Sequence, residues 1–145
     1  MAREGLKELM LLIPPSQFNK LARYNQLYTN IEIEAIPLFK TRQRQRGFNQ
    51  ALEICMFILG SFDFPQASNL IRNRDTLSQS QISKARDRKK NIKDAFILKT
   101  NQEPARRKIL LVDDVMTTGA TAAEAASLLK KRGAEKVFVF TLAKG

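Results

Sequence analysis

The segment KILLVDDVMTTGAT, residues 108–121, combines an apolar run, two adjacent carboxylates and a loop of threonines around a single glycine. An apolar run of this length between polar segments predicts a buried β-strand that ends near Asp113 and Asp114. Because open α/β sheets bind ligands beyond the carboxyl ends of their strands, we expect the functional site here. A single aspartate at a strand end is commonly a turn or capping residue, but the combination in residues 113–121 favours function.

The loop after the two carboxylates has the composition of a phosphate site. Threonine hydroxyls and the permissive backbone of Gly119 can converge on one anion. Thr121 and Glu124 have the spacing of a capping box, which predicts a helix directly after the loop, with its free amides facing the anion. The loop has no lysine, and neither a Walker pattern nor GxGxxG occurs. The acids would then accept hydrogen bonds from a vicinal diol, and a ribose 5-phosphate unit fits this arrangement.

This stretch resembles the phosphoribosyl diphosphate (PRPP) motif of type I phosphoribosyltransferases. The resemblance implies that Asp113 and Asp114 are the catalytic acids, which hold the ribose 2′ and 3′ hydroxyls. It also implies an α/β fold in which a mainly parallel sheet is flanked by helices, with a small hood region and a flexible basic loop. The implied 5′-phosphate loop consists of Val115, Met116, Thr117, Thr118, Gly119, Ala120 and Thr121.

Length and composition limit the class of protein. A chain of 145 residues with 43% hydrophobic residues predicts a single globular domain. The sequence has no histidine and one cysteine, Cys55, which excludes an internal disulfide, zinc chemistry and Ser-His or Cys-His catalysis. No apolar stretch has the length of a membrane span and no signal peptide is evident, so a soluble cytoplasmic protein is expected.

The formal charge of +11 points to anionic ligands, and much of the basic charge lies in two segments. Lys40–Arg46 has four basic residues without an acid, and residues 72–93 have eight against two aspartates. A solvated basic helix is the commonest explanation of such runs.

The other segments predict alternating helices and strands. Helices are expected at residues 3–12, 16–28 with Ser16 as the cap, 47–60 opened by Gly47, 78–93, and after Thr121 as far as Gly133. Strands are expected at residues 31–38, 69–72, 95–98 and 136–142, the last of them buried. Lys40–Arg46 should form a loop, and Cys55 should lie in the core. Strand, loop, helix and strand in this order predict a right-handed βαβ unit and a parallel sheet.

A second resemblance narrows the family. The sequence from Arg46 to Gln50, RGFNQ, and the later pattern resemble the ComF branch of the phosphoribosyltransferase superfamily over residues 36–145. The later pattern comprises Arg74, Thr76, Gln79 or Gln81, Arg88, Asn91, Ala95 and Phe96. The resemblance implies that Arg46 and Gly47 bind pyrophosphate. It maps residues 75–91 to the flexible loop, for which the candidate ligands are Arg74, Arg86 and Arg88.

The same resemblance bears on domain organisation. ComF proteins usually carry an amino-terminal four-cysteine zinc element, which this sequence lacks. Residues 1–30 are therefore expected to form a helical segment, as part of a hood or the remnant of a truncated form. Residues 31–145 are expected to form the phosphoribosyltransferase-like domain.

Two functions of different class remain open. In the first, the chain binds PRPP with Mg²⁺, which PRPP brings without a protein metal site, and transfers phosphoribosyl to a nitrogenous acceptor that the sequence does not identify. In the second, it is a non-catalytic sensor of PRPP or a nucleotide that binds DNA. The ComF resemblance implies a role in DNA uptake and natural transformation, with single-stranded DNA and competence or recombination proteins as partners. The oligomeric state stays open, a dimer included. A phosphoacceptor receiver domain is set aside because its acidic pair should lie near the start of the chain.

Overall fold

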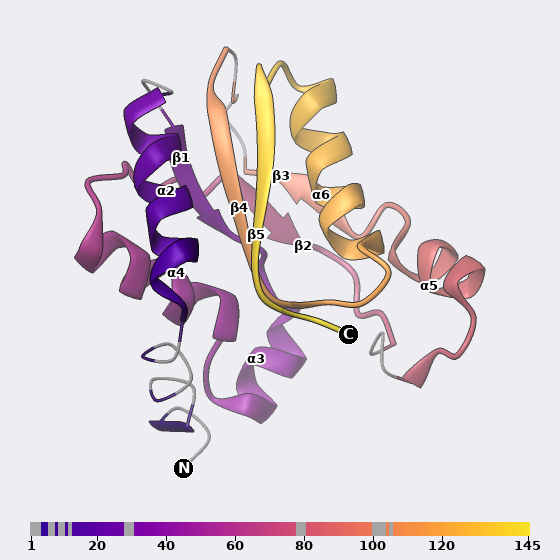
Figure 1. Ribbon diagram of the computed structural model, residues 1–145. Helices are drawn as coiled ribbons and strands as arrows, with labels where there is room; N and C mark the ends of the chain where they lie inside the picture. Colours follow the sequence, from indigo (N-terminus) through magenta and orange to yellow (C-terminus); the bar gives the residue numbers. More distant parts are fainter. Residues whose placement is uncertain are drawn as a thin grey trace.

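The computed structural model describes residues 4–5, 8, 11, 13–27, 31–77, 81–99, 104 and 106–145. Its centre is a parallel three-stranded sheet in the order β1-β4-β5 (Figure 1). These strands are β1 (Ile31–Ala35), β4 (Lys108–Met116) and β5 (Lys136–Lys144). The parallel α/β architecture predicted from the sequence is confirmed.

Alternation along β4 divides the core between the two faces of the sheet. Leu110 and Val112 pack with buried residues of β1, of α2 (Pro15–Leu27) and of α4 (Gln50–Ser61). Ile109 and Leu111 face the opposite way, where they pack with α6 (Ala120–Lys131). Figure 1 accordingly shows α2 and α4 on one side of the sheet and α6 on the other. Because both faces of β4 are covered, its apolar run is continuous rather than alternating.

A second, smaller sheet lies beside the first. It consists of β2 (Leu70–Arg72) and β3 (Phe96–Leu98), which pair antiparallel. Before β2 begins, Gln66 forms a parallel bridge with Ile33 of β1. The carboxylate of buried Glu34 accepts hydrogen bonds from the backbone N–H groups of Asn69 and Leu70, both at 2.6 Å, and thereby fixes the start of β2 against β1.

The first half of the chain differs from the prediction in its helix boundaries. The helix predicted at residues 3–12 lies mostly outside the described residues. α2 begins at Pro15, where a proline suits the first helical position, so the predicted cap at Ser16 is wrong. The predicted loop at residues 40–46 is the helix α3 (Lys40–Arg46). Gly47 ends this helix in a left-handed conformation with φ 77°, whereas α4 begins at Gln50.

The N-cap of α4 is Asn49, whose side chain accepts the N–H of Ala51 at 3.0 Å. Cys55 on this helix is a buried free thiol, as the apolar stripe predicted.

The second half also departs from the prediction at its ends. α6 begins at Ala120 after Gly119, and the predicted Thr121–Glu124 capping box is wrong: Glu124 instead accepts the N–H of Asp94 at 2.8 Å. The polar segment 78–93 gives only the short helix α5 (Ala85–Ile92) among its described residues. β5 is an edge strand rather than a buried one, and its Val139 is 42% exposed. None of the described helices combines the length and apolar character needed to cross a membrane.

Candidate ligand-binding site

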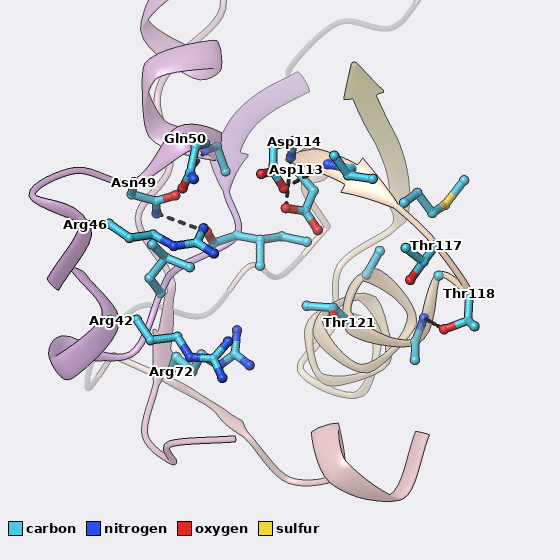
Figure 2. A pocket seen from close by; sticks show the side chains of 18 residues that line it. Arg42, Arg46, Asn49, Gln50, Arg72, Asp113, Asp114, Thr117, Thr118 and Thr121 are labelled. Atoms are coloured by element: carbon cyan, nitrogen blue, oxygen red, sulfur yellow. Dashed lines mark hydrogen bonds between the residues drawn. The ribbon is translucent and has the colours of Figure 1, made fainter. Parts of the chain in front are cut away.

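A cavity of about 340 Å³ opens at the carboxyl ends of β1 and β4 (Figure 2). β1 pairs with β4 only as far as Ala35 and Val112, whereas β4 continues beside β5 to Met116. The last residues of β4 therefore lose their neighbour on one side. The cavity is lined by Ile36, Leu38, Arg42, Arg46, Asn49, Gln50, Ala51, Arg72 and residues 113–122.

Asp113 and Asp114 lie in this final part of β4. The N–H of Asp114 donates to Oδ1 of Asp113 at 2.9 Å, and the N–H of Val115 donates to Oδ1 of Asp114 at 2.8 Å. These local bonds hold both carboxyl groups at the cavity wall. Each carboxylate has further acceptor positions free for a ligand's hydroxyl groups.

The pKa of Asp113 is raised from 3.8 to about 7, mainly by burial and secondly by the negative charge of Asp114. The guanidinium of Arg72 acts in the opposite sense and lowers it. At neutral pH this carboxyl group therefore exchanges between its protonated and ionised forms, so it can either donate or accept a hydrogen bond.

The threonine loop, residues 117–119, forms another wall of the cavity and leads directly into α6. Gly119 is left-handed, with φ 74°, and its carbonyl accepts the N–H of Ala123 at 2.8 Å in the first turn of the helix. The hydroxyl of Thr118 accepts the N–H of Ala120 at 3.4 Å. Of the residues predicted as the 5′-phosphate loop, Val115 and Met116 are the last residues of β4, Ala120 and Thr121 begin α6, and only residues 117–119 form the loop between them. All seven nevertheless line one cavity at the start of α6, where unpaired amides favour an anion.

Arginine side chains face this loop across the cavity (Figure 2). Arg46, predicted from the sequence, comes from the last turn of α3 and is exposed at the cavity wall. Gly47 does not line the cavity and instead turns the chain between α3 and α4. Asn49 joins the start of α4 to the residue that follows β1, because its Nδ2 donates to the carbonyl of Ile36 at 3.1 Å.

Arg42 and Arg72 are cavity residues that the sequence analysis missed. Arg42 precedes Arg46 by one helical turn, so recognition of Lys40–Arg46 as a helix would have placed both on one face. Arg72 alternates with Ile71 in β2 and faces inwards with Leu70. A strand of three residues gives too little pattern to reveal that orientation.

The predicted flexible-loop arginines lie elsewhere. Arg74 donates to the backbone carbonyls of Asn91 and Lys93, and Arg88 donates to the carbonyl of Ile82 at 2.7 Å. Arg86 is exposed on α5. None of the three lines the cavity, and their part in ligand binding stays a prediction.

Comparison with known proteins identifies the domain family of the chain. The model of the phosphoribosyl transferase domain matches residues 68–145, which include β4, the threonine loop and α6. The chain is also similar to several curated proteins. Competence protein F of Haemophilus influenzae is 39% identical over 125 residues, which cover 84% of this chain and 54% of that protein.

The DNA utilization protein YhgH of Escherichia coli is 40% identical, with 76% of this chain and 48% of that protein covered. For the competence protein ComFC of Bacillus subtilis, the identity is 36% and the coverage is 74% and 42%. The chain spans about half the length of these relatives. From the matched domain and these relatives, the chain belongs to the phosphoribosyl transferase domain family, in its ComF branch.

Proposed function

We propose that the chain binds PRPP in the cavity at the end of β4 and transfers its phosphoribosyl group to a nitrogenous acceptor. The observation that supports this most directly is the distribution of charge within one cavity. Two carboxyl groups lie between a loop of threonines on one wall and three arginines on the other. A sugar with a vicinal diol and phosphate groups at both ends matches that order.

In the proposed complex Asp113 and Asp114 accept hydrogen bonds from the ribose hydroxyls. The loop that ends at Thr121 holds the 5′-phosphate through its hydroxyls and through the amides that begin α6. Each charge-assisted hydrogen bond of this kind contributes about 1.5 to 3 kcal/mol, so a few of them suffice for binding without a lysine.

In the transfer step, the bond from the anomeric carbon to the pyrophosphate oxygen breaks, and pyrophosphate leaves with the bonding electrons. The positive charge that develops on the ribose is stabilised by the nearby carboxylates, and the arginines offset the charge of the leaving group. The acceptor nitrogen then forms the new bond to the same carbon and loses its proton to solvent. The chain's part is orientation and charge stabilisation, which need no histidine.

Mg²⁺ fits this ligand because hard cations prefer carboxylate and phosphate oxygens. Bound to the diphosphate, it would supply charge neutralisation to the leaving group. Asp113 and Asp114 are the acidic residues among those that line the cavity.

The names of the relatives support a role in the uptake or use of DNA. A second candidate function follows, in which the cavity senses PRPP or a nucleotide while the chain binds single-stranded DNA. The observation that favours it is the exposed basic surface of α5, which includes Arg86, Lys89 and Lys90 and lies outside the cavity. Such cations suit the nucleic-acid backbone.

Calorimetric titration with PRPP and Mg²⁺ tests the common part of both candidates. The double substitution Asp113→Asn/Asp114→Asn should weaken binding at least about tenfold through loss of charged acceptors. If the wild-type chain shows no heat of binding, both candidates are wrong. Release of pyrophosphate in the presence of a panel of nucleobases then separates transferase from sensor.

A further inference from the structure

β5 forms one edge of the parallel sheet, because it pairs with β4 and with no other strand in the part of the chain that the structure describes (Figure 1). It is nine residues long, and residues 137–143, VFVFTLA, carry neither a charge nor a proline. Natural proteins protect edge strands with charges, prolines or short length, because an open edge recruits further strands. A long apolar edge without these devices is expected to be covered by another segment.

A groove of about 340 Å³ lies beside this edge, on the face of the sheet that carries α2. Lys20 and Leu21 of α2, Leu110 of β4 and residues 138–141 of β5 are among the residues that line it. Lys20 is exposed, and it is the charged residue among the described ones of this lining. The groove therefore combines apolar surface with one positive charge.

The side chains of β5 leave apolar surface open on both faces of the strand. Phe138, Phe140 and Leu142 alternate towards α2 and α4 and are only partly buried against the core on that side. Val139 points to the opposite face and is exposed. A strand laid along β5 would cover these groups, and every second side chain of that strand would enter the groove.

The charges around the edge decide which kind of strand fits. Lys136 and Lys144 stand exposed at the two ends of β5, and Lys20 lies in the groove. Two-fold antiparallel pairing of β5 with a second copy about Phe140 would set the terminal lysines against each other, and each chain has a formal charge of +11. Like charges directly opposite are destabilising, whereas carboxylates on an added strand would be attracted by all three lysines.

We propose that β5 and this groove form a docking surface for an extended acidic segment of a partner protein, which adds to the sheet as a further strand. The segment has apolar side chains at alternate positions and carboxylates near its ends. Backbone hydrogen bonds along the edge provide affinity, and the groove and the lysines provide specificity. This surface shares no lining residue with the cavity at the end of β4, so the inference does not depend on the proposed ligand.

The test uses three synthetic peptides and fluorescence anisotropy. The first is a capped peptide in which valine and threonine alternate over seven positions between two glutamates at each end. In the second, lysines replace the glutamates. The third keeps the glutamates but has N-methyl groups on the amides of its valines and threonines, so it cannot pair as a strand. The wild type should bind the first peptide at least about tenfold more tightly than either of the others.

Two variants locate the binding. Val139→Glu introduces a negative charge on the edge, and Lys20→Glu reverses the charge in the groove, so each should weaken the first peptide at least about tenfold. Arg23→Glu is the matched control, because Arg23 is exposed on the same helix and does not line the groove. It changes the net charge equally and should leave the affinity within about twofold.

The inference is overturned if the wild type binds none of the peptides, or binds the lysine or N-methylated peptide as tightly as the first. Equal effects of Lys20→Glu and Arg23→Glu would also overturn it, because they would reflect net charge alone. Sedimentation tests the other occupant: a wild-type dimer that Val139→Glu dissociates would mean that a second copy covers the edge. Thermal unfolding checks each variant, and Lys20→Glu, at an exposed helix position, decides the question if Val139→Glu does not fold.

Discussion

Asp114 donates its backbone N–H to the carboxylate of Asp113 over 2.9 Å, and this bond fixes the Asp113 carboxyl group at the cavity wall. Burial and the adjacent negative charge give Asp113 a pKa of about 7 instead of 3.8. A folded-state pKa above the unfolded value means that the folded state binds the proton more tightly. The resulting stabilisation is present below about pH 4 and is lost as the pH rises to about 7.

Asp113→Asn should therefore flatten the dependence of stability on pH. Between pH 4 and pH 8 the wild type should lose about 1 to 3 kcal/mol of unfolding free energy that the variant keeps, because the variant has no buried carboxyl group to ionise at position 113. Urea unfolding across this pH range measures the difference, and Asp63→Asn, at an exposed position, is the control. Parallel stability curves for the wild type and Asp113→Asn would contradict the prediction. The same variant should bind PRPP more weakly, which is the trade between stability and function expected of a ligand-binding residue.

Glu34 is expected to be the main polar anchor between the two sheets. Its carboxylate accepts the backbone N–H groups of Asn69 and Leu70 at 2.6 Å and the side-chain amide of Asn69 at 2.8 Å. Glu34→Ala leaves these buried donors without an acceptor, and we expect a loss of about 2 to 4 kcal/mol of unfolding free energy.

Glu32→Ala is the matched control on the same strand. Glu32 pairs with the half-exposed Arg107 at 3.1 Å, and a surface ion pair contributes less than about 1 kcal/mol. Urea unfolding of both variants checks the difference. Equal losses for the two would show that burial of the acceptor is not what stabilises this junction.

Gly119 is predicted to be necessary for the shape of the phosphate loop. Its φ of 74° is left-handed, whereas an added Cβ would meet only the side chain of Met116, with Sδ at 3.6 Å and Cγ at 3.9 Å, which are ordinary contacts. The cost of Gly119→Ala is thus conformational, about 1 kcal/mol or somewhat more, and relaxation of the loop would turn its amides away from the phosphate.

Gly60→Ala is expected to change the stability of the fold in the opposite direction. Gly60 lies in α4 with open space around the added carbon, so the substitution should stabilise the fold by up to about 1 kcal/mol. Thermal unfolding and titration with ribose 5-phosphate measure both effects. Undiminished ligand affinity in Gly119→Ala would show that the loop backbone does not bind the phosphate.

The parts of the structure that could be predicted are those with local signals. β4 and α6 follow from an apolar run, a glycine and a helical stripe within 24 residues, Lys108–Lys131, and the carboxylates at the end of β4 could be placed without knowledge of the rest. The threonine loop was found for the same reason.

The missed features depend on contacts between distant segments. The spacing of Thr121 and Glu124 predicts a capping box, but Glu124 accepts the N–H of Asp94, thirty residues away. Helix α3 has no buried residue and hence no apolar stripe by which to recognise it, so the sequence predicts a loop around Arg42. β5 was expected to be buried because its residues are apolar, whereas a strand at the edge of a three-stranded sheet is covered less completely.

The last prediction separates DNA binding from binding in the cavity. Lys89 and Lys90 are exposed in the last turn of α5 and do not line the cavity, so Lys89→Gln/Lys90→Gln should leave PRPP affinity unchanged within about twofold. If α5 contacts the backbone of single-stranded DNA through both lysines, the slope of log affinity against log salt should become shallower by about 1.4.

Lys20→Gln/Arg23→Gln removes two exposed charges from α2, on the opposite side of the sheet, and is the charge-matched control (Figure 1). A gel-shift series over several salt concentrations measures the slopes. Equal slopes for the wild type and the α5 variant would exclude α5 from DNA contact. Loss of DNA binding in Arg72→Met together with an unchanged α5 variant would place the nucleic acid in the cavity, and the second candidate function would then require one site for both ligands.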